Sequence, residues 1–267
     1  MATNTIRRKE VNLLLPEGGV VTRRWLMQQG FSRHAIDNLV KSEQLATIAP
    51  GVYTRWDAKP SWQGFVYFMQ ENLGLNLTVG GLSALDLLGL SHYLPLSNQK
   101  KIHLYGAARL PLWSNKTAKD VRFIWHSEWG LLGGRRTEEL NQGDPLKRFT
   151  RLLPWKEGKA DLVLSSPERA LLEILAGVPH DISFEHADQL MQGMTSLSPS
   201  LLQALLQECR NVKVRRLFFL LADRHQHAWL KKMEPEKIDL GSGKRQVVEN
   251  GKLDKKYLIT IPKTYES

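Results

Sequence analysis

The chain has 267 residues, of which 42% are hydrophobic, and its 37 lysines and arginines outnumber its 27 aspartates and glutamates, giving a formal net charge of +10. A chain of this length buries roughly 70–75% of its surface without help, and Cys209 is the only cysteine, which excludes an internal disulfide framework and a cysteine-pair zinc site. No apolar run approaches the ~20 residues of a membrane span, and residues 1–10 lack the apolar run of a secretory signal, so we expect a cytoplasmic protein with an anionic partner.

The surplus positive charge is spread along the whole chain. Residues 1–59 carry nine basic and five acidic residues, residues 60–150 carry ten and seven, and the remainder carries eighteen and fifteen. Relative to its length, the first segment is the most basic. This distribution argues against a single basic tail and for a footprint that runs from the first segment across the later basic turns. Nucleic acid is favoured over anionic lipid because no strongly basic amphipathic helix stands out.

The N-terminal residues show the helix pattern of a winged helix-turn-helix. Apolar side chains at helical spacing predict a first helix over residues 6–15, which ends at a proline- and glycine-rich breaker. Thr22 and Ser32 are suitable N-cap residues for two further helices, over residues 23–29 and 33–41. Three short helices in this order predict that the third one is the recognition helix.

A predicted β-hairpin completes the pattern. Two β-prone runs, residues 45–48 and 52–56, flank the turn signal Pro50-Gly51 and predict a wing. In this arrangement the third helix enters the major groove and the second crosses the phosphate backbone. The wing tip brings Arg55 to the neighbouring strand or the minor groove. The alternative is a small helical subdomain with a solvated charged face. The candidate DNA contacts are Arg23, Arg24, Ser32, Arg33, His34, Asn38, Lys41 and Arg55.

The middle of the chain predicts a small sheet between helices. An aromatic stripe from Ser61 to Gly74 predicts a core helix. Gly80-Gly81 predicts a tight turn into a buried helix, because a phosphate loop requires further glycines at fixed spacing. Alternating residues at 102–105, 121–125 and 160–164 predict three strands.

The C-terminal half predicts a helical bundle followed by a basic turn and a hairpin. Ser166, Ser183 and Ser198 each stand where a helix N-cap is expected, and Cys209 falls on an apolar face as a core residue. A further helix is predicted over residues 212–223, with Lys213, Arg215 and Arg216 outside its apolar stripe. Beyond the basic turn Gly241–Arg245, residues 246–248 and 257–261 predict the terminal hairpin.

Catalytic and metal-binding patterns do not stand out. His225 and His227 are too close in sequence to share one helix face as zinc ligands. Gly241–Arg245 lacks the first glycine of a Walker loop and has Arg245 where a magnesium-binding Ser or Thr is required. We identify no nucleophile–histidine pair or carboxylate dyad, and we predict no catalytic residue, metal or cofactor.

Four stretches of the sequence are distinctive when taken together. They are the winged helix around Val20–Trp56, the segment Gly80–Leu90, the helix start Ser166–Glu173, and the tail Ile238–Arg245 with Lys252–Tyr257. Together they resemble the AbiEi-type antitoxins, the antitoxin halves of type IV (abortive-infection) toxin–antitoxin pairs. The resemblance covers nearly the whole chain, and the last two stretches are the most specific.

The resemblance implies a DNA-binding autorepressor that binds inverted repeats in its own promoter through the winged helix. It also implies that the C-terminal domain opposes a nucleotidyltransferase toxin without a stable toxin complex. Basic residues of the C-terminal domain are expected to help hold DNA. The secondary DNA-binding candidates that follow from the resemblance are Lys213, Arg215, Arg216, Lys244 and Arg245.

We therefore predict an α+β protein with a winged helix-turn-helix domain over residues 1–59. A mixed α/β antitoxin-like domain, with a small sheet and a helical bundle, is predicted over residues 60–267. Two other functions fit the same sequence: a nucleic-acid-processing enzyme targeted by the winged helix, and a plain transcription factor whose C-terminal half senses a small molecule or dimerises.

Overall fold

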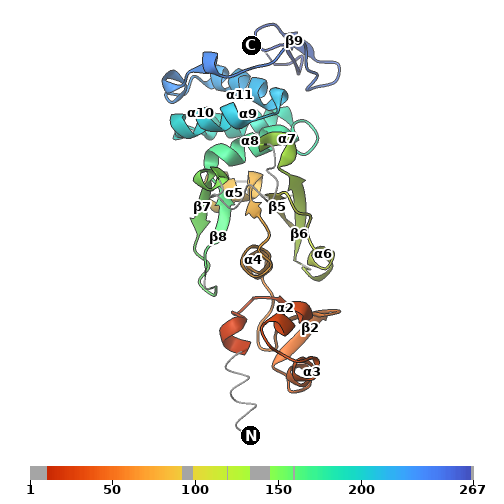
Figure 1. Ribbon diagram of the computed structural model, residues 1–267. Coiled ribbons are helices and arrows are strands. Elements are labelled where there is room, and N and C mark those ends of the chain that lie inside the picture. The colour runs from red at the N-terminus through yellow and green to blue at the C-terminus, as the bar shows by residue number, and fades with distance from the viewer. Residues whose placement is uncertain (1–10, 92–98, 119, 133–144, 159, 266–267) are drawn as a thin grey trace.

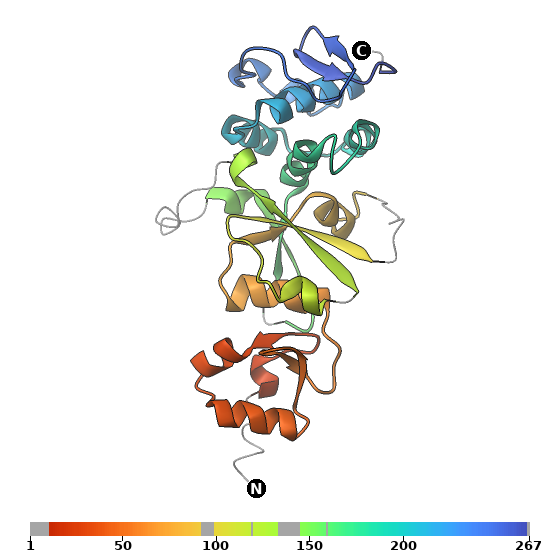
Figure 2. The same cartoon turned by 90° about the vertical axis from the view of Figure 1, so that its right-hand side faces the viewer.

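A computed structural model describes residues 11–91, 99–118, 120–132, 145–158 and 160–265. The chain is arranged in three tiers along one long axis, with a small helical unit at one end, a β-sheet in the middle and a helical bundle at the other end (Figures 1 and 2). The predicted α+β class is confirmed. Among the described residues, no helix is long and apolar enough to cross a membrane.

The N-terminal tier has the winged-helix order that the sequence predicts. Residues 11–14 are helical, and the remainder of the predicted first helix lies outside the described residues. The three strands form a sheet in the order β1-β3-β2. The elements of this tier are β1 (Val21–Thr22), α2 (Arg23–Gln28), α3 (Arg33–Lys41), β2 (Leu45–Ala49) and β3 (Val52–Arg55).

Both predicted N-caps of this tier are present. The Thr22 hydroxyl accepts a hydrogen bond from the backbone N–H of Trp25 at 3.2 Å, and Ser32 accepts one from Ala35 at 3.1 Å. Gly30, with a φ of 90°, makes the left-handed turn after α2 that residues with a Cβ adopt at a cost. These local signals fix where α2 ends and where α3 begins.

The middle tier is built on a five-stranded sheet of order β6-β5-β4-β8-β7, in which β5 and β6 are parallel. Short helical segments α4 and η1 lie between this sheet and the N-terminal tier (Figure 2). The elements are α4 (Trp62–Tyr67), η1 (Phe68–Asn72), β4 (Leu77–Val79), α5 (Gly81–Leu87), β5 (Lys100–Gly106), α6 (Ser114–Thr117), β6 (Val121–Ser127), α7 (Trp129–Leu132), η3 (Pro145–Phe149), β7 (Thr150–Leu153) and β8 (Leu162–Ser165).

Strands β4 and β7 extend the three-stranded sheet that the sequence predicts. Strand β4 has three residues and runs directly into the Gly80-Gly81 turn, so it is too short to show alternation. At the far edge of the sheet, the side chain of Asn115 bonds the backbone of β6. Its amide nitrogen donates to the Phe123 carbonyl at 2.9 Å, and its oxygen accepts from the Phe123 N–H at 2.8 Å.

The C-terminal tier is a bundle that ends in a small hairpin. The predicted serine caps are present, because Ser166, Ser183 and Ser198 each accept a hydrogen bond from the backbone N–H three residues later. Cys209 is buried, as predicted. The elements are α8 (Pro167–Gly177), α9 (Phe184–Gly193), α10 (Pro199–Glu208), α11 (Val212–His225), η4 (Leu230–Lys232), η5 (Pro235–Lys237), β9 (Lys252–Asp254) and β10 (Ile259–Ile261).

The predicted partner of the last strand is wrong. Strand β10 pairs with β9, whereas residues 246–248 lie beside it without forming a strand. The backbone N–H groups of Val247 and Val248 donate to the Thr260 hydroxyl at 2.8 and 3.1 Å instead of joining a ladder. Asp254 accepts from the N–H of Tyr257 at 2.6 Å, and this local turn selects the tighter hairpin.

The winged helix and the sheet share one hydrophobic core. Trp25 of α2 packs edge-to-face on Phe68 of η1, with ring centroids 5.9 Å apart. Gly64 of α4 lies directly against the backbone of Gly18, and a Cβ added at Gly64 would stand 2.0 Å from the Gly18 carbonyl oxygen. The domain boundary between residues 59 and 60 therefore stays a prediction. Residues from both sides of it pack together in one core.

Candidate nucleic-acid interface

Helix α3 lies at the end of the molecule that is farthest from the bundle (Figure 1) and presents a polar face. Its inner side chains Ala35, Ile36 and Leu39 are buried against the N-terminal core. The outer face is exposed and carries Arg33, His34, Asn38 and Lys41, as predicted. These side chains supply the guanidinium, imidazole, amide and ammonium donors that read base edges and phosphates in a major groove.

Arg23 holds the N-terminal tier together. Its Nη2 donates to the Asp37 carboxylate of α3 at 2.7 Å, and its Nε donates to the Tyr53 hydroxyl of β3 at 2.8 Å. The hydrogen bonds to Tyr53 and Asp37 raise the pKa of Arg23. Arg23 therefore links α2 to α3 and to the wing, and its side chain is still 36% exposed.

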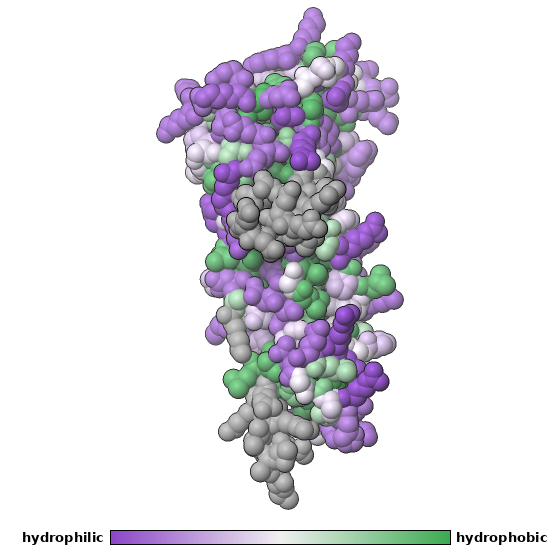
Figure 3. Space-filling view, in the orientation of Figure 1, coloured by the Kyte–Doolittle hydropathy of each residue, from purple (hydrophilic) through white to green (hydrophobic). Residues whose placement is uncertain are grey.

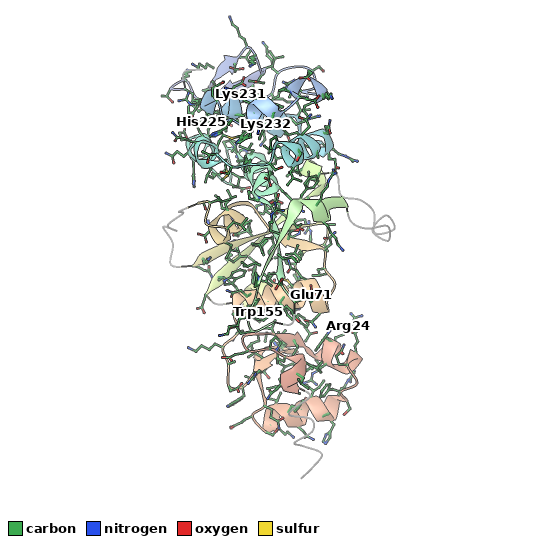
Figure 4. The ribbon with its side chains drawn as sticks, turned by 90° about the vertical axis from the view of Figure 1, so that its left-hand side faces the viewer. Arg24, Glu71, Trp155, His225, Lys231 and Lys232 are labelled. Carbon is green, nitrogen blue, oxygen red and sulfur yellow. The ribbon has the colours of Figure 1, made fainter. Side chains whose placement is uncertain are left out.

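Arg24 and Arg33 are the two arginines of this surface that have no partner in the described part of the chain. Both side chains are exposed, and neither makes a hydrogen bond or an ion pair with another described residue. Figure 4 shows Arg24 on the side of the N-terminal tier that adjoins the middle tier. Both arginines are therefore available to an anion. Ser32 is exposed as well, while its hydroxyl caps α3.

The prediction that Arg55 lies at the wing tip is wrong. The tip is Pro50-Gly51, which lies beside α2 because the Gly51 carbonyl accepts a hydrogen bond from the N–H of Arg23 at 2.8 Å. Arg55 pairs with Leu45 at the opposite end of the hairpin. Its guanidinium makes two hydrogen bonds to Asp57, at 2.9 and 2.7 Å, and these raise the pKa of Arg55.

The buried guanidinium of Arg216 corrects a second prediction. The residue is 1% exposed and lies under the tail, not outside the apolar stripe of α11. Its nitrogens donate to the carbonyls of Leu240 at 2.6 Å, Gly243 at 2.5 Å, Gly241 at 2.9 Å and Leu258 at 3.2 Å. Burial lowers the pKa of Arg216. This side chain organises the tail and has no surface for DNA.

Lys213 and Arg215 also depart from their predicted exposure. The Lys213 ammonium donates to the carbonyls of Ala176 at 2.8 Å and Val178 at 2.6 Å, which closes the C-terminal end of α8. Arg215 is 9% exposed. Lys213 is half-buried, so neither residue presents a free basic side chain at this end of α11. Lys244 and Arg245 are exposed, and hydrophilic side chains cover most of their tier on the face that Figure 3 shows.

The two histidines after α11 have structural partners. His225 Nε2 lies 2.8 Å from the Asp188 carboxylate, and His227 Nε2 lies 2.8 Å from the Met191 carbonyl. Figure 4 places His225 in the C-terminal tier, far from Arg24. No group of three or more potential metal ligands occurs within the described ranges.

A buried ionic cluster joins two of the sequence motifs and was missed by sequence reasoning. The Glu173 carboxylate accepts from the N–H of Gly81 at 2.8 Å, from the Ser165 hydroxyl at 2.9 Å and from Arg169 Nε at 2.8 Å. Arg169 also contacts Glu128 at 3.3 Å. Burial raises the pKa of Glu173. The cluster connects the sheet to the bundle, and only the helical spacing of Arg169 and Glu173 hints at it in the sequence.

Comparisons with known proteins agree with this architecture. Residues 7–96 match the family described as "Transcriptional regulator, AbiEi antitoxin N-terminal domain". Residues 99–262 match "Transcriptional regulator, AbiEi antitoxin, Type IV TA system". The crystal structure of the RV2827C protein from Mycobacterium tuberculosis has a similar fold, with a TM-score of 0.53 and 17% sequence identity over 90% of this chain and 85% of that one. No curated protein matches the chain.

Proposed function

Because the chain belongs to the AbiEi family of transcriptional-regulator antitoxins of type IV toxin–antitoxin systems, we propose that it is a cytoplasmic autorepressor that binds inverted repeats in its own promoter. The observation that carries the proposal is the exposed polar face of α3 at the end of the molecule that is farthest from the bundle. A helix anchored on one side and free on the other fits the width of a major groove.

The proposed contacts divide into two kinds. Arg33, His34, Asn38 and Lys41 face the base edges, and Arg24 near the start of α2 faces phosphate. Arg23 acts by positioning α3, through Asp37. Lys244 and Arg245 remain secondary candidates, whereas Lys213, Arg215 and Arg216 are removed from the proposed contacts by their internal bonds or burial.

The antitoxin half of the proposal is opposition to a nucleotidyltransferase toxin without a stable complex. Family membership supports it. Co-expression with the product of the adjoining reading frame tests it: growth should be restored by the chain, and the two proteins should not co-purify. Continued toxicity would overturn this half alone.

Promoter binding tests the regulatory half. We expect the Asn38→Ala variant to relax base preference, because an amide that pairs with adenine is worth roughly 1–3 kcal/mol of discrimination. Arg24→Ala should weaken binding to all sequences similarly and reduce the slope of log K against log salt by about one unit. Fluorescence anisotropy with promoter and scrambled duplexes measures both effects.

Arg151→Ala is the matched control, because Arg151 is an exposed arginine of β7 outside the winged helix. It should leave affinity and base preference unchanged. Salt-insensitive binding, or equal affinity for promoter and scrambled duplexes, would contradict the proposal.

A further inference from the structure

A groove runs between the N-terminal and middle tiers. Its volume is about 1050 Å³, and it is bounded by α2, the start of α3, the wing tip and two segments of the middle tier. Three arginines and no acidic residue line it. The lining residues include Arg23, Arg24, Arg33, Met27 and Trp113.

The floor of the groove is apolar and firmly supported. Trp113 packs on Phe65 and Phe68, with ring centroids 6.1 and 6.0 Å apart. Met27, which also lines the groove, is 41% exposed. The groove therefore leaves hydrophobic surface in water, which an apolar ligand would cover.

The rim of the groove is cationic, and only part of its charge is engaged by other side chains. Arg23 is engaged with Asp37 and Tyr53, but Arg24 and Arg33 have no partner among the described residues. Guanidinium groups bind carboxylates through paired, charge-assisted hydrogen bonds. The phosphate backbone of DNA would use this rim and leave the apolar floor uncovered.

We propose that the groove binds a small amphipathic carboxylate, with its ring or chain on the Trp113 and Met27 surfaces and its carboxylate between Arg24 and Arg33. Because Arg33 also belongs to the recognition face, an occupied groove withdraws a cation from DNA. Ligand binding therefore weakens promoter binding. This coupling rests on the proposed function, whereas ligand binding itself does not.

Calorimetric titration of the full DNA-free chain with naphthalene-2-carboxylate tests the groove. We expect saturable binding, with acetate and the neutral naphthalene-2-carboxamide each at least tenfold weaker, because each lacks one of the two contacts. Arg24→Ala and Met27→Glu should each weaken binding at least tenfold, and Arg151→Ala should leave it unchanged. Circular dichroism confirms that each variant is folded.

Absence of saturable binding, equal binding of the carboxamide, or equal binding by the Arg24→Ala and Met27→Glu variants would overturn the assignment. The coupling is tested by promoter anisotropy at constant ionic strength, with and without saturating naphthalene-2-carboxylate. An at least fivefold loss of promoter affinity supports it, and unchanged affinity overturns it. A chain that binds the carboxylate but no promoter would overturn the proposed function and leave the groove assignment intact.

Discussion

Arginine side chains in this protein have two roles that composition does not separate. Arg24 and Arg33 are exposed and unpaired within the described chain, so their charge is available to a partner. Arg216 is buried under four backbone carbonyls, and Arg169 is buried between two carboxylates. The count of 37 lysines and arginines therefore overstates the number of cations that are available to a partner.

We expect the Arg216→Met variant to destabilise the C-terminal tier. The substitution leaves the carbonyls of Leu240, Gly241 and Gly243 without their buried donor, and we expect the free energy of unfolding to fall by about 3 kcal/mol. Urea denaturation followed by circular dichroism measures the loss. The exposed Arg245→Met is the control and should change stability by less than about 0.5 kcal/mol. Equal effects of the two variants would contradict the structural role.

His103 predicts a pH dependence of stability. Burial, with the neighbouring His126, lowers the pKa of His103 from 6.5 to about 4. The unfolded chain therefore binds a proton first as the pH falls, so the contribution of neutral His103 is present above pH 6.5 and is lost towards pH 4. By pH 5 we expect a loss of roughly 2 kcal/mol from this group.

Urea denaturation of the protein and of its His103→Asn variant at pH 7.5 and 5.0 checks this expectation. When the pH falls from 7.5 to 5.0, the His103→Asn variant should gain roughly 2 kcal/mol of stability relative to the protein that has His103. A difference independent of pH would show that His103 is not held neutral by the fold.

At the scale of elements, close backbone contact determines how the winged helix meets the sheet. Gly64 lies on the side of α4 that touches Gly18, and Ser61 donates its N–H to the Gly18 carbonyl at 2.8 Å. No side chain fits between the two segments. The approach fixes α4 against the loop before β1.

The Gly64→Ala variant should be destabilised by about 2–3 kcal/mol, because the new methyl group collides with backbone that has no freedom to rotate away. Thermal unfolding measures the change. Gly193→Ala, at the end of α9, is the matched control because a Cβ there meets nothing within 4 Å. Comparable melting temperatures for both variants would contradict the close packing.

Local signals in the sequence predicted where helices begin better than they predicted which distant segments pack together. Ser32, Ser166 and Ser198 cap the helices where the pattern placed them, because capping depends on residues three positions apart. The partner of β10 and the burial of Arg216 depend on contacts between distant segments. Of the candidate site, the face of α3 was predictable from helical spacing. The groove was not, because Trp113 reaches it from a loop without periodicity.

At the scale of the whole molecule, the hydrophobic cluster of the N-terminal tier continues into the sheet. Buried residues of both the winged helix and the sheet belong to this one cluster, and a second cluster fills the bundle. Helix α3 is thus carried on a base that includes the middle tier. The packing of Trp25 on Phe68 joins α2 to that base.

We expect a fragment of residues 1–59 to be largely unfolded on its own, because it lacks Phe65 and Phe68, which cover part of its core. The proton–nitrogen NMR spectrum of the fragment should show poor dispersion, while the full chain gives dispersed signals for α2 and α3. A well-dispersed fragment spectrum would show that the winged helix is stable without the middle tier.

The amide of Asn115 has a consequence for behaviour at high concentration. Strand β6 is an edge strand, and an open edge recruits the strands of other molecules into fibres. Asn115 occupies both the N–H and the carbonyl of Phe123, as a neighbouring strand would. One side chain, carried by the short helix α6, thus closes the pairing position at Phe123 to an incoming strand.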